Sequence, residues 1–193
     1  MNPDEKAVYL TFDDGPIPES TPWIVETLDR YGVKATFFMV GDNVRKYPEL
    51  YQLLKDHGHR LGNHTHNHIG GITVPSSRYL RNANEADKYI HSNLFRPPRG
   101  WMRNQQYIRI RRHYTIIMWD LVTRDYSTHL SADDVFENVK RFARNGSIIT
   151  FHDSLRSIDK LRTALPRCIE WLQEQGYEFK VFDEKLQHSR KMK

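Results

Sequence analysis

The sequence predicts an α/β fold in which helices flank a parallel β-sheet. Short apolar runs rich in β-branched and aromatic residues alternate with segments whose apolar residues recur at helical spacing. About seven strands, with helices between them, follow one another along 193 residues without a linker-like stretch, which indicates one domain. An open doubly wound sheet and a closed barrel both satisfy this pattern. In either fold, ligands bind at the carboxyl ends of the strands.

The predicted strands are short and apolar, and several end at a polar residue or a turn signal. The first stops at two adjacent carboxylates and a Gly-Pro pair that favours a turn. The fourth stops at a Pro-Pro pair. The seven strands are expected at Val8–Phe12, Ala35–Val40, His59–Asn63, Leu94–Arg96, Thr115–Trp119, Ser147–Phe151 and Glu178–Phe182.

The predicted helices are bounded by capping residues, prolines and glycines. Ser131 followed by Asp134 is typical of a helix start, and apolar residues recur at helical spacing before Asn93. Because proline is tolerated only in a first turn, Pro166 places the start of the last helix near Thr163. The helices are expected at 22–32, 48–57, 75–93, 104–112, 131–146 and 163–176.

Composition narrows the class of protein. The net charge of +5 and a pI near 9.3 favour anionic partners, but the basic residues are scattered and no stacking or base-reading motif supports a nucleic-acid partner. Cys168 is the only cysteine, which excludes an internal disulfide and a cysteine-based metal site.

No apolar stretch could span a membrane and no signal peptide is evident, so we expect a cytoplasmic protein, or a periplasmic or extracellular one if a leader has been removed. Residues 187–193 form a basic tail that we expect to be disordered, outside a domain of residues 1–186.

Polar side chains follow most of the predicted strands. Because the carboxyl ends of parallel strands lie at one rim of a sheet, we expect these side chains to converge there. The segments are Asp13-Asp14 after the first strand, Gly62–His68 after the third, Arg96–Gly100 after the fourth, Trp119–Asp125 after the fifth and His152-Asp153 after the sixth.

His64 and His68 are four residues apart, which on one helical turn places both rings on the same face. With one carboxylate of the Asp13-Asp14 pair they would form a three-ligand metal site with a position open for water. The alternatives are solvated loop histidines and a plain Asp-Asp-Gly-Pro turn. His152, which follows an apolar strand, is either a functional imidazole or a hydrogen-bonded structural histidine.

Five ordered segments resemble the motifs of the NodB-like polysaccharide deacetylases, carbohydrate esterase family 4. They are Thr11-Phe12-Asp13-Asp14-Gly15-Pro16, His64-Thr65-x-x-His68, Arg96-Pro97-Pro98-x-Gly100, the loop at Asp125 and Phe151-His152-Asp153. The resemblance implies a distorted (β/α) barrel with one divalent metal, usually zinc, although cobalt or nickel would suit the same ligands.

The resemblance also implies a role for each motif residue. Asp14, His64 and His68 would hold the metal, Asp13 would be the general base and His152 the general acid, while Arg96 would hold Asp13 and Asp125 would tune His152. Arg99, Gly100 and Trp101 would form the oxyanion and substrate site. Three residues depart from the family pattern: Arg99 replaces the usual Tyr, Tyr126 a common Trp, and Thr150 a usual Leu.

The sequence thus predicts a metal-dependent hydrolase that removes N-acetyl groups from N-acetylated sugars in a chitin-like polymer or peptidoglycan. The metal would polarise the acetamide and lower the pKa of a bound water, with Asp13 and His152 moving the protons. The alternative is a catalytically silent module that binds carbohydrate or metal, which would be favoured if Arg99 filled the pocket.

Overall fold

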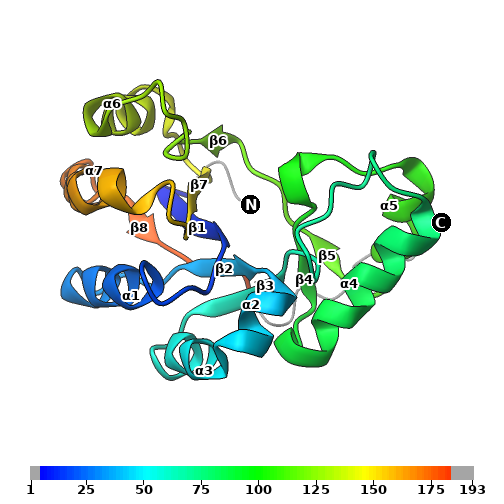
Figure 1. Cartoon of the computed structure of the whole chain (residues 1–193). Coiled ribbons are helices and arrows are strands. Elements are labelled where there is room, and N and C mark those ends of the chain that lie inside the picture. Colours follow the sequence, from blue (N-terminus) through cyan, green and yellow to red (C-terminus); the bar gives the residue numbers. More distant parts are fainter. Residues whose placement is uncertain (1–4, 184–193) are drawn as a thin grey trace.

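The computed structural model describes residues 5–183, which form a curled parallel sheet of eight strands with helices on the outside (Figure 1). The strand order is β5-β4-β3-β2-β1-β7-β6, with β8 beside the start of β1, and every pairing is parallel. The order leaves β5 and β6 at opposite ends of this path, so the sheet is a half-barrel. The predicted α/β fold and its distorted-barrel form are confirmed.

The strands are β1 (Ala7–Asp14), β2 (Thr36–Met39), β3 (Arg60–Asn63), β4 (Leu94–Phe95), β5 (Thr115–Ile116), β6 (Leu121–Val122), β7 (Ile148–His152) and β8 (Glu178–Phe179). The helices are α1 (Thr21–Arg30), α2 (Gly41–Lys46), α3 (Pro48–Asp56), α4 (Ser76–Ile90), α5 (Asn104–Ile110), α6 (Ala132–Phe142) and α7 (Ile158–Glu174), with a 3₁₀ turn η1 (Pro98–Gly100).

Strand β1 lies inside the sheet, between β2 and β7, and is buried along nearly all of its length. Its Phe12 ring stacks on Phe37 of β2 and Phe151 of β7, with ring centroids 5.0 and 5.6 Å apart. Strands buried on both faces read as continuous apolar runs, which explains the sequence of β1. The register pairs Asp13 with His152 at the carboxyl ends of β1 and β7, so the packing of the core positions these two functional candidates side by side.

The predicted fifth strand, Thr115–Trp119, is wrong in extent. Only β5 pairs with β4, and the chain then crosses without a helix to β6, which pairs with β7 at the other edge (Figure 1). The strict alternation of strands and helices therefore fails at this point. The physical reason is a side chain: Arg96 donates from Nε to the carbonyl of Ile117 and from Nη2 to that of Met118, both at 3.2 Å. Because Arg96 donates to these two carbonyls, they do not need hydrogen bonds from a neighbouring strand.

The predicted start of the last helix near Thr163 is also wrong. Helix α7 begins at Ile158, and Pro166 lies inside it rather than in its first turn. An internal proline costs about 3 kcal/mol. The extra turns bury Ile158 and Leu161, and a fully buried aliphatic side chain contributes about 1.5–3 kcal/mol, so packing offsets the cost of the proline.

The side chain of Cys168 is fully buried in the main apolar cluster. Within the part of the chain that the structure describes, no helix combines the length and apolarity needed to cross a bilayer. The predicted basic tail, residues 187–193, lies outside the described residues.

Candidate active site

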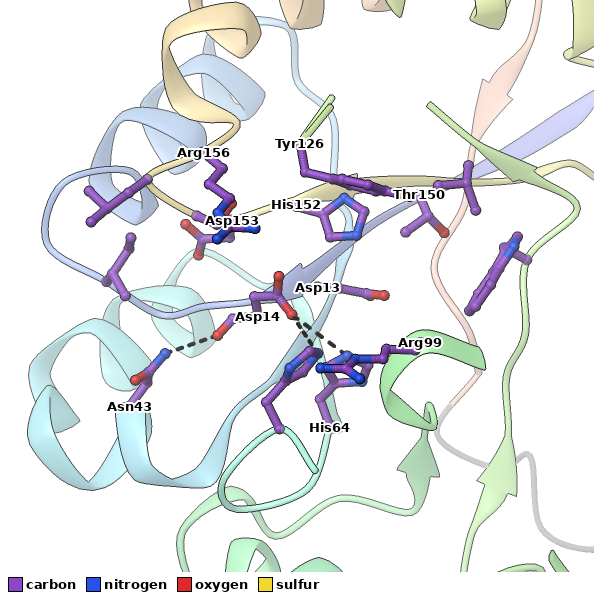
Figure 2. Close-up of a pocket in the computed structure, with 16 residues that line it drawn as sticks. Asp13, Asp14, Asn43, His64, Arg99, Tyr126, Thr150, His152, Asp153 and Arg156 are labelled. Carbon is purple, nitrogen blue, oxygen red and sulfur yellow. Dashed lines mark hydrogen bonds and ion pairs between the residues drawn. The ribbon is translucent and has the colours of Figure 1, made fainter. Parts of the chain in front are cut away.

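A cavity of about 720 Å³ lies at the carboxyl ends of β1, β3 and β7 (Figure 2). Six of the sequence-predicted site residues line it: Asp13, Asp14, His64, His68, Arg99 and His152. Asp120, which the sequence places near the same rim, lies elsewhere. Its carboxylate accepts from the backbone N–H of Ile148 at 2.6 Å, and Ile148 is the first residue of β7. Asp120 therefore caps the opposite end of the sheet.

Asp14, His64 and His68 form one cluster whose ligand atoms all lie within 4.8 Å of one another. Asp14 Oδ1 lies 3.2 Å from His68 Nε2 and 3.7 Å from His64 Nε2, as the dashed lines in Figure 2 show. Asn43 donates to the backbone carbonyl of Asp14 at 3.0 Å and so fixes this residue at the strand end.

The protonation state of His64 is set by its surroundings. The ring is fully buried, and this burial lowers its pKa against the opposing pull of Asp13 and Asp14. His64 Nδ1 donates to the carbonyl of Arg96 at 2.7 Å, which leaves a lone pair on Nε2 toward Asp14. Asp14 Oδ1 is itself buried and accepts no hydrogen bond among the described residues. A carboxylate oxygen without a donor, facing an imidazole lone pair, is the environment that a cation stabilises.

The histidine pair comes together through a loop. The expected helical turn is wrong, because residues 64–68 have no helical structure and Thr65 and His68 have φ angles of 66° and 51°. This backbone path still brings the rings of His64 and His68 to 5.1 Å between centroids. It turns the third histidine of the segment away, and the His66 ring stacks on Tyr89 instead.

Arg96 is fully buried and holds Asp13. Its Nη1 donates to Asp13 Oδ1 at 2.7 Å, to Thr11 Oγ1 at 2.8 Å and to Thr150 Oγ1 at 3.2 Å. The guanidinium also lies over the Phe38 ring, 4.1 Å from its centroid. A buried ion pair is tolerated when its remaining donors are satisfied, and Thr150, which stands where the family usually has Leu, supplies one of the acceptors. The result is a carboxylate fixed at the cavity wall.

Asp125 and His152 form a second fixed pair. His152 Nδ1 lies 2.8 Å from Asp125 Oδ1, and the His152 backbone N–H donates to Asp125 Oδ2 at 2.7 Å. Burial lowers the pKa of His152, but the hydrogen bond and charge of Asp125, with smaller contributions from Asp13 and Asp14, raise it to about 9. The imidazole is thus protonated at neutral pH. Tyr126 packs edge-on against it, with ring centroids 4.7 Å apart.

Of the three predicted oxyanion and substrate residues, only Arg99 is part of the cavity lining. Arg99 lines the cavity, and its φ of 60° turns the chain at η1. Gly100 packs against Trp119, where an added Cβ would lie 2.3 Å from Trp119 Cη2. Trp101 is 67% exposed and lies outside the cavity lining, whereas Trp119 is part of it.

Sequence reasoning missed Asp153 as a site residue. Its buried carboxylate accepts from Ser20 Oγ and from Thr21 Oγ1, the latter at 2.6 Å. Burial raises its pKa to about 7 against these two hydrogen bonds. A Cβ at Gly15 would lie 2.0 Å from Asp153 Oδ2, which explains the glycine after the acidic pair. The usable signal was the Ser20-Thr21 pair at the start of α1, which supplies the donors that a buried acid needs.

Comparison with known families identifies the protein class. A family model described as polysaccharide deacetylase matches residues 1–115, more than half of the chain. The chain belongs to the polysaccharide deacetylase family. The predicted NodB-like resemblance is confirmed, and so is the predicted class of enzyme, a deacetylase that hydrolyses a carbon–nitrogen bond. The match ends before Asp125 and His152.

Individual relatives extend over this second half. A peptidoglycan-N-acetylglucosamine deacetylase of Bacillus cereus is 29% identical, over 96% of this deacetylase and 90% of the relative. The peptidoglycan-N-acetylmuramic acid deacetylase PdaC of Bacillus subtilis is 30% identical, over 92% of this chain and 38% of PdaC. A crystal structure of a peptidoglycan N-acetylglucosamine deacetylase superposes with a TM-score of 0.88 at 29% identity, covering 93% of this chain and 87% of that one.

Proposed function

We propose that this deacetylase removes N-acetyl groups from the sugars of peptidoglycan, with a divalent cation held by Asp14, His64 and His68. The observation that carries the proposal is the buried, donor-free Oδ1 of Asp14 beside the two imidazole Nε2 atoms. One carboxylate and two neutral imidazoles are a donor set that suits zinc, and also cobalt or nickel. A cation bound there would polarise the acetamide carbonyl and lower the pKa of a water molecule.

Asp13 is suited to accept the proton of the attacking water. Its carboxylate is only 4% exposed, and Arg96 fixes one oxygen at 2.7 Å, so it cannot rotate freely away from the cavity. A base held in place loses less entropy on reaching the reactive geometry than a mobile one.

His152 is suited to protonate the departing amine. Asp125 occupies Nδ1, which leaves the Nε2–H of the imidazolium for the substrate nitrogen. Protonation of the substrate nitrogen allows the C–N bond to break, with acetate and a free amine as products. The strand register places Asp13 and His152 beside each other on β1 and β7, so the base and the acid can reach the same acetamide.

Two observations support peptidoglycan as the polymer. Two curated relatives are named for peptidoglycan, one for its N-acetylglucosamine and one for its N-acetylmuramic acid. The cavity wall carries two arginines, Arg99 and Arg156, which favour a polymer bearing carboxylates over a neutral one. The silent-module alternative would be favoured if Arg99 filled the pocket, but about 720 Å³ remains with Arg99 in the wall.

The direct test is acetate release from peptidoglycan fragments by protein stripped with a chelator and then reloaded with zinc. We expect activity only after reloading, and we expect His68→Ala to lose both the metal, measured by elemental analysis, and nearly all turnover. His113→Ala, which removes an exposed histidine away from the cavity, is the matched control. Unchanged metal content in His68→Ala, or full activity in the stripped protein, would refute the proposal.

A further inference from the structure

We infer that a second cavity beside the catalytic one is an anion subsite that binds a carboxylate of the glycan strand. The inference deepens the proposed function and rests on it. The cavity has a volume of about 470 Å³ and is lined by Arg124, Tyr126, Ser127, Thr128 and Arg156. Two of these residues carry a positive charge, three carry hydroxyls, and none is acidic.

The second cavity adjoins the catalytic cavity. Tyr126 and Arg156 line both, so a ligand that spans them passes along the Tyr126 ring. That ring also packs edge-on against His152, as Figure 2 shows, which places the subsite one aromatic side chain from the proposed acid. A substituent bound there belongs to the same substrate molecule as the acetamide in the catalytic cavity.

Among the described residues, 5–183, the two arginines have no anionic partner. Across residues 5–183 neither Arg124 nor Arg156 forms an ion pair, whereas other exposed arginines do, for example Arg144 with Asp120. A third cation lies at the base of the loop: Lys160 donates to the backbone carbonyls of Asp125 and Ser127 and forms no ion pair in the part of the chain that the structure describes. Such a group of cations attracts an anion, and the arginine side chains favour bidentate binding of a carboxylate.

The loop that carries the subsite is fixed before any ligand arrives. Lys160 holds it from α7, and the backbone N–H of Ser127 donates to the carbonyl of Arg124 at 2.9 Å. Arg124 has a φ of 61°, an uncommon angle for an arginine, which the surrounding hydrogen bonds maintain. The Ser127 hydroxyl accepts from the backbone of His129 at 3.3 Å, so its own proton remains free to donate. A preorganised site loses less entropy on binding.

Peptidoglycan offers two carboxylates with this chemistry: the lactyl group of a muramic acid and the acidic groups of its peptide stem. Three substrates separate them: a neutral N-acetylglucosamine tetramer, a glycan fragment with its lactyl groups but no stem, and a fragment with the stem attached. The variants are Arg124→Gln, Arg156→Gln and the double variant. Arg109→Gln on α5 is the control, since it removes the same charge from an exposed arginine outside both cavities.

We expect each single variant to raise KM for an acidic substrate two- to fivefold, and the double variant about tenfold, with kcat unchanged. The difference should shrink in 0.5 M salt, because screening weakens exposed charge pairs. Dissociation constants measured by calorimetry in an Asp13→Asn background should rise by the same factors. An effect confined to the stem-bearing fragment assigns the carboxylate to the peptide, and an equal effect on both fragments assigns it to the lactyl group.

The inference is overturned if the double variant leaves both acidic substrates unchanged, if the neutral tetramer is weakened equally, or if Arg109→Gln has the same effect. Failure of the proposed function gives a different result, because the parent protein would then release no acetate from any of the three substrates.

Discussion

Replacing Asp125 with Asn tests whether this buried carboxylate keeps His152 in its acidic form. The change preserves the size of the side chain but removes the charge beside Nδ1. Asn also lacks a second acceptor oxygen, so it cannot accept from both the ring and the backbone N–H of His152 as Asp125 does at 2.8 and 2.7 Å.

The magnitude follows from the pKa of His152, which stands at about 9 instead of the ordinary 6.5. A cation held by Asp14 would cancel the contribution of Asp14, so Asp125 carries most of the shift. At pH 7.5 an imidazole with a pKa of 9 is almost fully protonated, and one at 6.5 is protonated to about a tenth. Burial would lower the pKa further once the charge is gone, because desolvation opposes the imidazolium. We therefore expect Asp125→Asn to lose roughly 10- to 100-fold in kcat at pH 7.5.

The assay is a pH profile of kcat together with an NMR titration of the His152 ring. In the parent protein the alkaline limb of kcat should fall near pH 9, and in Asp125→Asn it should move below pH 7. His152 should also make folding stability depend on pH. Because its pKa is higher in the folded protein than in the unfolded chain, it contributes stability that is present below pH 6.5 and is lost as the pH rises through about 9. An unchanged alkaline limb in a variant that still folds would refute the role of Asp125.

Three further variants test the surrounding site. Asp13→Asn should retain the metal but lose about 100-fold or more in kcat. It should also lower the free energy of unfolding by about 3–5 kcal/mol, because Arg96 is left buried without its anion. Metal analysis and thermal melting measure the two effects. Arg99→Tyr should weaken binding of carboxylate-bearing substrates by about 0–1 kcal/mol relative to neutral oligomers, with a smaller effect at high salt, and equal movement of both activities would exclude Arg99 from substrate selection. Gly100→Ala should cost about 1–3 kcal/mol in a denaturant titration, because φ is 75° and the new Cβ would meet Trp119; unchanged stability would contradict the contact.

The sequence predicted those parts of the site that follow from strand ends. Asp13, Asp14 and His152 each end a buried apolar strand, so parallel pairing alone brings them to one rim. The pairing of His64 with His68 was also predicted, but for a wrong reason, because a loop with left-handed residues replaces the helical turn.

The errors arise where a tertiary contact overrides a local signal. The break between β5 and β6 depends on donors from Arg96, which lies 21 and 22 positions before the carbonyls it satisfies. The early start of α7 depends on burial of Ile158 and Leu161, which outweighs the local signal of Pro166. Asp153 depends on hydroxyls more than 130 positions away. No window along the sequence contains these partners.

The hydrogen bonds of Arg96 limit which substitutions this protein can accept. One guanidinium both anchors the segment that spans the gap between β5 and β6 and fixes Asp13. Lysine has three donors on a single atom and cannot reach both groups of acceptors, so Arg96→Lys would not be conservative here. The gap in the barrel and the proposed catalytic base are therefore coupled: a change that alters the spanning segment also shifts the base. Substrate preference can vary more freely at Arg99 in η1 and at Arg124 and Arg156, which are not part of this coupling.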